Sequence, residues 1–275
     1  MLSYQHGYHA GNHADVLKHL VLMRVLSHLN RKPRPWTYLD THSGRGLYAL
    51  DSAMARKTGE AEQGIQRLRE LASAPEILSD YLTLTARPDG RYTGSPAIAL
   101  ALAREDDRLI LCERHPTEYR ALKEAMQSLP HKARIRCLAE DGYQALRASL
   151  PPTSRRGAIL IDPSYETDAD FAAVAGALAE GLRRFGTGVF MVWYPCLDTR
   201  QARELPQRLR RLANGPWLDA RLNLSNVIFK GLAGSGVFVA NPPWTLHNDL
   251  DTAMPVLAHC LGGDEQAGIV LESGD

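Results

Sequence analysis

The first feature of the chain is a run of apolar residues at the spacing of a helix. Between Asn12 and Leu29, apolar side chains recur at every third or fourth position, which is typical of an amphipathic α-helix. Basic residues and prolines follow at 31–35 and would end this helix. We therefore expect an N-terminal helical segment over residues 1–34.

Beyond this segment, short apolar runs alternate with stretches of helical pattern. The first run, at 36–40, leads into a glycine-containing turn, as the first strand of a doubly wound sheet does. Strands that alternate with helices form a mainly parallel sheet. Further runs that end in polar or turn residues lie at 108–114, 133–142, 157–165 and 186–195, and helical stretches lie beside them at 117–129, 170–185 and 199–213.

Two segments depart from this alternation. Apolar runs at 217–225 and 235–244 are joined by a glycine-containing segment and predict an antiparallel hairpin that closes the sheet. The charged segment at about 48–91 has a helical pattern, which predicts a helical insertion after the first strand. The sequence contains no linker long enough to separate two domains, so we expect a single α/β domain over 1–275.

Composition narrows the class of protein without naming a partner. The 275 residues are 44% hydrophobic and are enough to bury a large core. Lys and Arg total 32 against 31 Asp and Glu, so any nucleic-acid surface must be a local patch. The four cysteines form no CxxC pair, which favours reduced thiols. Because no apolar run suits a signal peptide or a membrane helix, we expect a cytoplasmic protein with no membrane partner.

The predicted strand ends carry candidate ligand-binding residues. The loop from Asp40 to Gly46 contains two glycines that would let the backbone approach a ligand, but it lacks the third glycine of a dinucleotide fingerprint. Glu113 ends the second parallel strand, where an acid can accept hydrogen bonds from ribose hydroxyls. Asp141-Gly142 ends the third, at a position suited to a cofactor's adenine. Each feature also has an interpretation without a ligand. The glycine loop would be a tight turn, Glu113 a solvated acid, and Asp141-Gly142 an ordinary Asp-Gly turn.

A sharper signal is Asp162-Pro163-Ser164-Tyr165, which follows the apolar run at 158–161. It resembles the D/N/S-P-P-Y/F/W motif of methyltransferases that modify exocyclic or amide nitrogens. An adenine amino group is a poor nucleophile because its lone pair is delocalised into the ring. If the Asp162 carboxylate and the Pro163 carbonyl each accept one N6 hydrogen, the lone pair is directed at the methyl donor and the developing charge is stabilised. Tyr165 would stack on the target base.

A second copy of this pattern, Asn241-Pro242-Pro243-Trp244, matches it more closely letter by letter. Ligands of doubly wound sheets bind near the first strands and the switch point, where the strand before Asp162 is expected. Asn241 closes the presumed last strand, at the edge-side hairpin, where the prolines would simply end the strand. We therefore assign the motif to Asp162.

Together these segments resemble the bacterial 23S ribosomal RNA adenine-N6 methyltransferases of the RlmJ type over nearly the whole chain. The resemblance rests on LSYxHxxHAGNHADVLKH at the start, YLDTHxGxG, YTGSPAIA, the acid followed by HP at 113–116, EDGYQAL, SRRGAILIDPSYE, and the late WYP and NPPW. The first of these is long and unusual, and therefore specific.

The resemblance implies a class I S-adenosylmethionine-dependent methyltransferase fold of Rossmann-like type, with a single adenine of 23S ribosomal RNA as target. It also implies that the N-terminal segment covers the cofactor pocket, that Asp162 is catalytic together with Pro163 and Tyr165, and that Tyr4 and Tyr165 meet the RNA. The residues expected to bind S-adenosylmethionine are Lys18, His19, Asp40, His42, Gly44, Ser95, Glu113, Asp141 and Gly142.

Two residues depart from the family pattern. Ser164 stands where the family has proline, which removes a fixed φ from the loop. Arg45 lies inside the glycine loop, where a small or apolar residue is commoner. The histidines His6, His9, His13 and His19 lie close together, but no Cys or carboxylate cluster accompanies them and we expect no metal site.

Several basic groups are candidates for RNA phosphate contacts if they flank one crevice. We expect a monomer that acts on free 23S RNA or on an early assembly intermediate. The alternatives are methylation of DNA adenine or of a protein glutamine, a nicotinamide-dependent oxidoreductase, and a non-catalytic nucleic-acid-binding protein that serves the use of external DNA. The basic candidates are Arg31, Lys32, Arg34, Arg56, Lys57, Arg155, Arg156, Arg208, Arg210 and Arg211.

Overall fold

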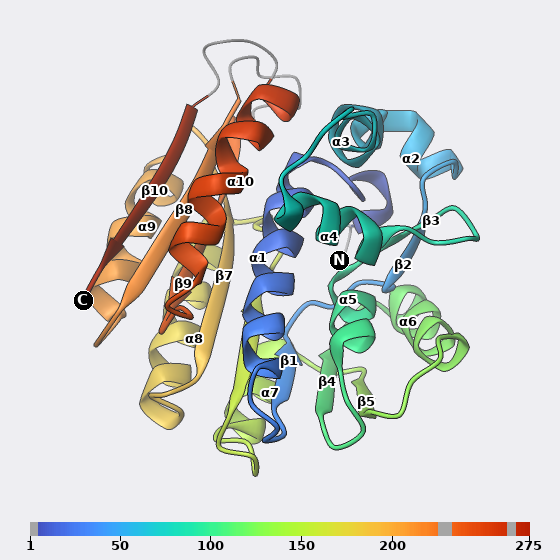
Figure 1. Cartoon of the computed structure of the whole chain (residues 1–275). Helices are drawn as coiled ribbons and strands as arrows, with labels where there is room; N and C mark the ends of the chain where they lie inside the picture. The colour runs from blue at the N-terminus through green and yellow to red at the C-terminus, as the bar shows by residue number, and fades with distance from the viewer. Residues whose placement is uncertain (1–4, 225–232, 263–267) are drawn as a thin grey trace.

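The fold is built around an eight-stranded sheet with β1 near its middle (Figure 1). The computed structural model describes residues 5–224, 233–262 and 268–275. The strand order is β10-β8-β9-β7-β6-β1-β4-β5. The strands are β1 (Thr37–Asp40), β4 (Arg108–Cys112), β5 (Arg134–Leu138), β6 (Gly157–Ile161), β7 (Val189–Pro195), β8 (Trp217–Asn223), β9 (Gly234–Ala240) and β10 (Gly268–Gly274).

The first five of these strands run parallel, and the last three are joined to them in antiparallel register. β1 pairs with β4 on one side and with β6 on the other, so the chain reverses its direction of travel across the sheet at β1. Such a switch point opens a crevice at the carboxyl ends of the strands. The expected α/β class, with a mainly parallel sheet and an antiparallel hairpin of β8 and β9, is confirmed.

The position of that hairpin differs from the expectation. β9 lies between β7 and β8, and the additional strand β10 pairs with β8 and forms the edge of the sheet. The segment that ends at Asn241 is therefore neither the last strand nor an edge strand. The residues of β10 are half-exposed, and their apolar pattern is too weak to predict a strand from the sequence.

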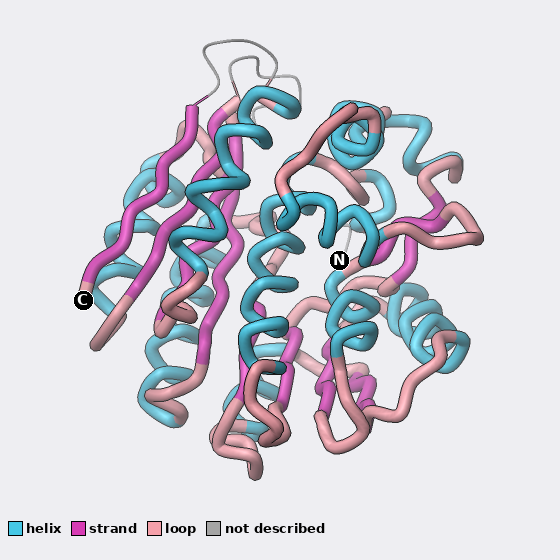
Figure 2. The backbone as a smooth tube through the Cα atoms, in the orientation of Figure 1, coloured by secondary structure: helices cyan, strands magenta, loops and turns pink. Residues whose placement is uncertain are grey.

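Helices cover both faces of the sheet (Figures 1 and 2). One core lies under α1, α5, α6 and α10, and the other lies under α7, α8 and α9. This two-sided cover explains the continuous apolar runs of the parallel strands. The helix bounds are α1 (His13–Asn30), α5 (Ser95–Leu102), α6 (Pro116–Ser128), α7 (Gly142–Ser149), α8 (Asp168–Arg184), α9 (Arg200–Leu212) and α10 (Leu246–Leu261), and a short 3₁₀ turn, η1 (His6–Tyr8), precedes α1.

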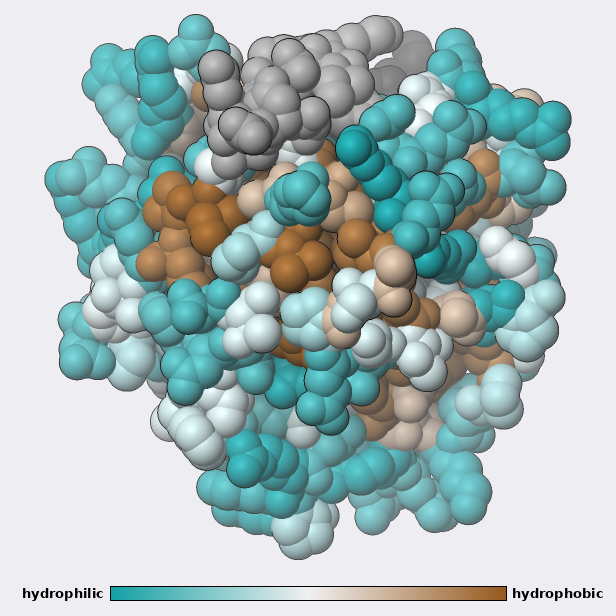
Figure 3. Space-filling view, turned by 45° about the horizontal axis from the view of Figure 1, so that its top comes forward, coloured by the Kyte–Doolittle hydropathy of each residue, from teal (hydrophilic) through white to brown (hydrophobic). Residues whose placement is uncertain are grey.

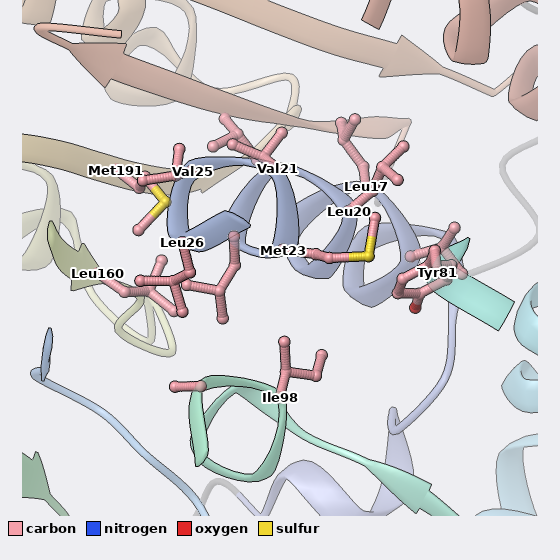
Figure 4. Close-up of a cluster of buried hydrophobic side chains, with 14 of the residues drawn as sticks. Leu17, Leu20, Val21, Met23, Val25, Leu26, Tyr81, Ile98, Leu160 and Met191 are labelled. Atoms are coloured by element: carbon pink, nitrogen blue, oxygen red, sulfur yellow. The ribbon is translucent and has the colours of Figure 1, made fainter. Parts of the chain in front are cut away.

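Helix α1 is buried on nearly all sides, so the expectation of a single apolar face was wrong. Asn12 caps its start by accepting a hydrogen bond from the Asp15 amide at 2.9 Å. Its side chains face Ile98 of α5 as well as the sheet residues Leu160 and Met191 (Figure 4). Because α1 lies between the sheet and other helices, it also buries the polar residues near its amino end.

The insertion after β1 is largely helical, as its pattern predicts, and is framed by a small antiparallel sheet that the pattern did not reveal. That sheet pairs β2 (Leu47–Ala49) with β3 (Arg91–Thr93). The insertion is tied to the N-terminal segment by a hydrogen bond of 2.7 Å from the Ile65 amide to the Gly11 carbonyl. Its helical elements are α2 (Ala53–Thr58), the π-helical turn η2 (Glu62–Gln66), α3 (Arg67–Arg69) and α4 (Glu76–Thr85).

The surface is mostly hydrophilic around its margins. In Figure 3, hydrophilic residues border the visible face and hydrophobic residues gather near its middle. Trp244 and Ile269 are the only large hydrophobic residues among those described whose side chains are exposed. Within the same described ranges, no helix has both the length and the apolar character needed to cross a membrane.

Candidate active site

A cavity of about 990 Å³ opens at the carboxyl ends of β1, β4, β5 and β6. Its walls come from the N-terminal segment, the loops after these strands, and the insertion. Because parallel strands present their carboxyl ends at one edge, residues far apart in the sequence meet here. Of the residues predicted to form the site, the cavity is lined by Lys18, His19, His42, Gly44, Ser95, Glu113, Asp141, Gly142, Asp162, Pro163 and Tyr165. Tyr4 lies outside the described residues.

The glycine loop and the end of β4 are held together by Glu113. Its carboxylate accepts hydrogen bonds from the Gly44 amide at 2.9 Å and the His115 amide at 2.7 Å. Gly44 has a φ of 60°, a conformation that suits glycine. Burial raises the pKa of Glu113 above its ordinary value. A carboxylate has about four acceptor positions, so Glu113 retains acceptor capacity toward the cavity.

Asp141 and Gly142 bring the start of α7 against the loop after β1. The Asp141 carboxylate caps α7 by accepting from the amides of Tyr143 and Gln144. A Cβ atom on Gly142 would lie 1.9 Å from the Thr41 carbonyl oxygen. Only glycine permits this backbone approach, which is the physical meaning of the Asp-Gly pair in the sequence.

Asp40 lies beneath the glycine loop and is absent from the cavity wall. Its carboxylate is fully buried and accepts hydrogen bonds from the Ser95 hydroxyl at 2.7 Å, the Tyr38 hydroxyl at 2.9 Å and the His42 amide at 3.2 Å. Burial raises the pKa of Asp40 to about 6. The direct cofactor contact expected of Asp40 is therefore unavailable, because its oxygens hold the loop from below.

The Asp162 carboxylate is joined to the N-terminal helix by Lys18. The Lys18 ammonium lies 2.7 Å from Asp162 Oδ2 and 2.8 Å from Asp15 Oδ1. Asp162 keeps a partly exposed side chain at the cavity, whereas Asp15 is buried. The sequence analysis predicted Lys18 in the donor pocket but did not predict Asp15. The two residues are three positions apart on a helix, a spacing at which their side chains can meet and which could have indicated the pair.

Asp15 is the centre of a buried polar network. It also accepts from the Gly11 amide at 2.9 Å and is bonded to His6 Nε2 at 2.8 Å. Burial opposes ionisation of Asp15, but His6, Lys18 and His19 together hold the pKa of its carboxyl well below the usual range. Burial likewise opposes the Lys18 charge, but Asp15 and Asp162 keep the Lys18 pKa well above normal. Lys18 is therefore a fixed cation between two carboxylates.

Asp162 differs from Asp15 in the balance of these effects. Burial raises the pKa of Asp162 above its ordinary value, and the nearby Lys18 only partly offsets this shift. Its neighbour Tyr165 adopts a φ of 49°, an uncommon conformation for a residue other than glycine. The Tyr165 hydroxyl donates to the Trp193 carbonyl at 2.7 Å, and its ring packs against Phe171. These contacts hold the loop after β6 in its unusual shape.

Two histidines of the cavity wall, His19 and His42, are kept neutral by burial. Burial lowers the pKa of His19 to about 3 and that of His42 to about 4. His19 Nδ1 is bonded to the Tyr92 hydroxyl at 2.8 Å, and the His42 ring meets the Tyr143 ring edge-on. Across the ranges that the structure describes, no three His, Cys, Asp or Glu side chains are grouped to hold a metal ion.

The second copy of the motif lies at the opposite end of the strands from Asp162. β9 runs antiparallel to β7, so Asn241 comes after the end of β9 that adjoins the start of β7. The Asn241 amide donates to the carbonyls of Gly186 at 2.9 Å and Gly188 at 2.8 Å. Strand direction thus supports the assignment of the motif to Asp162, because Asn241 lies at the other end of the strands. We expected Asn241 to be excluded by a position on an edge strand, and that reason was wrong.

Comparison with known proteins agrees with this geometry. The family model described as "RsmJ: Ribosomal RNA large subunit methyltransferase D, RlmJ" matches residues 33–272. A protein of Escherichia coli strain K12 named "Ribosomal RNA large subunit methyltransferase J" is 41% identical over 263 residues, which are 94% of this chain and 93% of that protein. The Haemophilus influenzae protein of the same name is 40% identical over 268 residues, or 95% and 94% of the two chains.

A solved structure from Legionella pneumophila supports the same relationship. It superimposes with a TM-score of 0.88 at 33% sequence identity and covers 97% of this chain and 99% of its own. The match therefore includes the N-terminal segment, the insertion and the antiparallel end of the sheet. The chain belongs to the RlmJ family of ribosomal RNA large subunit methyltransferases.

Proposed function

We propose that this protein transfers a methyl group from S-adenosylmethionine to the N6 nitrogen of one adenine in 23S ribosomal RNA. The observation that carries the proposal is the Asp162 carboxylate, which Lys18 holds at the wall of a cavity formed by the strand ends. The relatives named as ribosomal RNA methyltransferases support the RNA class of the substrate. The match of Asp162-Pro163 to an amino-methylating motif supports adenine N6 as the acceptor.

The residues at the strand ends fit S-adenosylmethionine. Glu113 has free acceptor positions for ribose hydroxyls, and Asp141 lies at the next strand end, where an adenine amino group would be bound. The close approach of Gly142 to the Thr41 carbonyl brings the start of α7 against the loop after β1. His42, Gly44 and Ser95 also line the cavity. When bound, S-adenosylmethionine supplies an activated methyl group on a positively charged sulfur.

Asp162 and Pro163 would orient the acceptor amino group. Lys18 occupies Asp162 Oδ2, which leaves Oδ1 to accept one N6 hydrogen, and the Pro163 carbonyl accepts the other. Two acceptors in fixed positions direct the nitrogen lone pair away from the protein and stabilise positive charge on the nitrogen. Because the Lys18 pKa is raised, Lys18 stays protonated and acts as a positioning residue rather than a base. The N6 proton is lost after methyl transfer.

We further propose that Tyr165 stacks on the target adenine and that Tyr4 contacts the RNA. Tyr165 lines the cavity beside Asp162, and its hydroxyl is fixed by Trp193. An extruded base could therefore lie between the Tyr165 ring and the donor site, as required for chemistry on a nucleobase. A monomer in the cytoplasm, acting on free 23S RNA or on an early assembly intermediate, completes the proposal.

Ser164 is expected to be tolerated in place of the family proline. Its side chain is exposed, and its hydroxyl lies 3.2 Å from Glu166 Oε1 rather than at the catalytic carboxylate. Ser164→Pro should therefore leave the methylation rate unchanged or raise it up to about threefold, because a fixed φ reduces the freedom of the loop. Steady-state methyl transfer to 23S RNA measures this effect. A loss of tenfold or more would instead assign a function to the hydroxyl.

Gly142→Ala is expected to weaken S-adenosylmethionine binding at least about tenfold. The added Cβ would meet the Thr41 carbonyl, so α7 and the loop after β1 must move apart. Calorimetric titration with S-adenosylmethionine measures the change in Kd. Gly176→Ala is a matched control, because a Cβ there meets open space on the helix α8. Equal affinities of both variants would contradict the assignment of this contact to the donor site.

The proposed function is tested by transfer of labelled methyl from S-adenosylmethionine to protein-free 23S RNA that lacks the modification, beside duplex DNA. The expected result is label in RNA alone, mapped to one adenine as N6-methyladenine. Label in DNA alone would retain the chemistry and change the substrate. Binding of S-adenosylmethionine and RNA without any transfer would favour a non-catalytic nucleic-acid-binding protein.

A further inference from the structure

Three loops meet at the end of the sheet that lies opposite the cavity. Residues 31–35 precede β1, residues 151–156 precede β6, and residues 241–245 follow the antiparallel strand β9. The cavity lies at the far ends of β1 and β6. The basic candidates therefore do not all flank one crevice. Among the ten candidates, Lys57 lines the cavity. Five others lie at the opposite end of the sheet, namely Arg31, Lys32, Arg34, Arg155 and Arg156.

The backbone of the 31–35 loop is held by two arginines from neighbouring elements. Arg104 donates to the carbonyls of Lys32 and Arg34, each at 2.9 Å. Arg156 donates to the Arg34 carbonyl at 2.7 Å and also to the Leu29 carbonyl. These bonds fix the loop backbone, so the exposed side chains of the loop are presented from a preorganised support.

The charges at this end of the sheet have no carboxylate partner in the part of the chain that the structure describes. Over residues 5–224, 233–262 and 268–275, no carboxylate forms an ion pair with Arg31, Lys32, Arg34, Arg155 or Arg156. Some exposed arginines elsewhere do form ion pairs, as Arg183 does with Glu180. Burial and the neighbouring Arg104 and Arg34 lower the pKa of Arg156, which reflects the crowding of positive charge. Of the acids in the loop before β4, Asp107 is buried and bonded to Arg104, whereas Glu105 and Asp106 are exposed and Asp106 lies 3.9 Å from Arg134.

An exposed aromatic ring lies beside these cations. The Trp244 side chain is 73% exposed, and the Arg31 guanidinium lies 5.2 Å from its ring centre. The His28 ring meets Trp244 edge-on at 6.3 Å. Cations that attract phosphates, combined with an aromatic face on which a base can stack, are the features of single-stranded nucleic-acid binding.

We infer that Arg31, Lys32, Arg34, Arg155, Arg156 and Trp244 form a second RNA-binding surface, which holds the RNA backbone away from the target adenine. The inference rests on the proposed RNA substrate and adds a contact remote from the catalytic cavity. An acidic membrane is a weaker fit, because Trp244 is the single large hydrophobic side chain exposed on the described part of this surface. The two ends of the sheet are separated by strands of about 17 Å, so only a long RNA reaches both.

The test compares RNA binding and methylation in variants of the intact protein. In Arg31→Gln/Lys32→Gln/Arg34→Gln, three charges are removed whose side chains form no ion pair in the described structure. Arg183→Gln/Arg200→Gln/Arg203→Gln removes three exposed charges elsewhere and is the matched control. Trp244→Leu removes the stacking face. Affinity for protein-free 23S RNA is measured over a range of salt concentrations, with methylation kinetics on the same RNA.

The first variant is expected to bind 23S RNA about tenfold more weakly, with a salt dependence reduced by about two to three phosphate contacts. Its KM for RNA should rise while kcat and S-adenosylmethionine affinity stay unchanged. Trp244→Leu should weaken RNA binding about fivefold or more. The control variant should resemble the wild type.

Unchanged RNA affinity in the first variant, or an equal loss in the control, would overturn the inference. Loss of binding to phosphatidylglycerol vesicles, with RNA binding intact, would replace it with a membrane contact. If the wild type binds 23S RNA but transfers no methyl group, the proposed function fails, and the comparison of RNA affinities still decides whether this surface binds RNA.

Discussion

Asp162→Ala is expected to lower kcat for methyl transfer about 10²–10³-fold while S-adenosylmethionine binds with nearly unchanged affinity. In the proposed mechanism the carboxylate holds the acceptor amino group and stabilises charge on it, and removing one fixed electrostatic contact from an enclosed site has an effect of this size. Glu113 and Asp141, the acids proposed to bind the donor, stay in place because backbone amides outside the Asp162 loop hold them. Single-turnover transfer to 23S RNA measures the rate, and calorimetric titration measures donor binding.

Asp162→Asn is the graded control for this prediction. The amide keeps one oxygen acceptor but loses the negative charge, and it leaves the Lys18 ammonium with Asp15 as its remaining carboxylate partner. Its rate should lie between those of the wild type and Asp162→Ala. If Asp162→Ala transferred methyl groups at the wild-type rate, Asp162 would have no part in the chemistry, and Pro163 with the rest of the loop would need another assignment.

Asp15→Asn is expected to lower the free energy of unfolding by about 3 kcal/mol, because it breaks a buried ionic network at its centre. Lys18 and His6 lose their shared partner, and Lys18 is left with Asp162 alone. We also expect kcat to fall, because the Asp162 carboxylate then lacks a fixed support. Urea unfolding measures the stability, and methyl transfer below the unfolding transition measures the rate.

The pH dependence of stability provides a second readout for Asp15. Because the pKa of Asp15 is held well below its unfolded value, its stabilisation is complete above the unfolded pKa and is lost as the pH falls toward the folded pKa. Asp15→Asn should lack this acid-dependent loss. Asp249→Asn breaks a half-exposed pair with Arg24 and should cost less than about 1 kcal/mol. Equal destabilisation by the two variants would show that Asp15 is an ordinary surface-type ion pair.

Local patterns in the sequence determined the class of fold and the residues proposed to carry the chemistry. Buried parallel strands are continuous apolar runs that end abruptly, so β4 and β6 and the acids after them could be located without coordinates. The half-exposed edge strand β5 shows instead an alternation of basic and apolar residues. The Asp162-Pro163 motif and the Asp141-Gly142 pair are also local, because each needs particular residues in a fixed order, whereas the contact of Gly142 with Thr41 is not local. The family relationship follows from the same motifs and is confirmed over nearly the whole chain.

Contacts between distant segments were decided only by the tertiary structure. The pattern of apolar residues along the chain does not contain strand direction. It could therefore not show that Asn241 lies at the opposite end of the strands from Asp162. Nor could it show that Asp40 supports the loop from below, since that depends on the packing of Ser95 against β1. Lys18 and Asp162 are 144 residues apart, and their ion pair exists because α1 is buried against the sheet. The sequence thus determined which groups the protein has, and packing decided which of them meet.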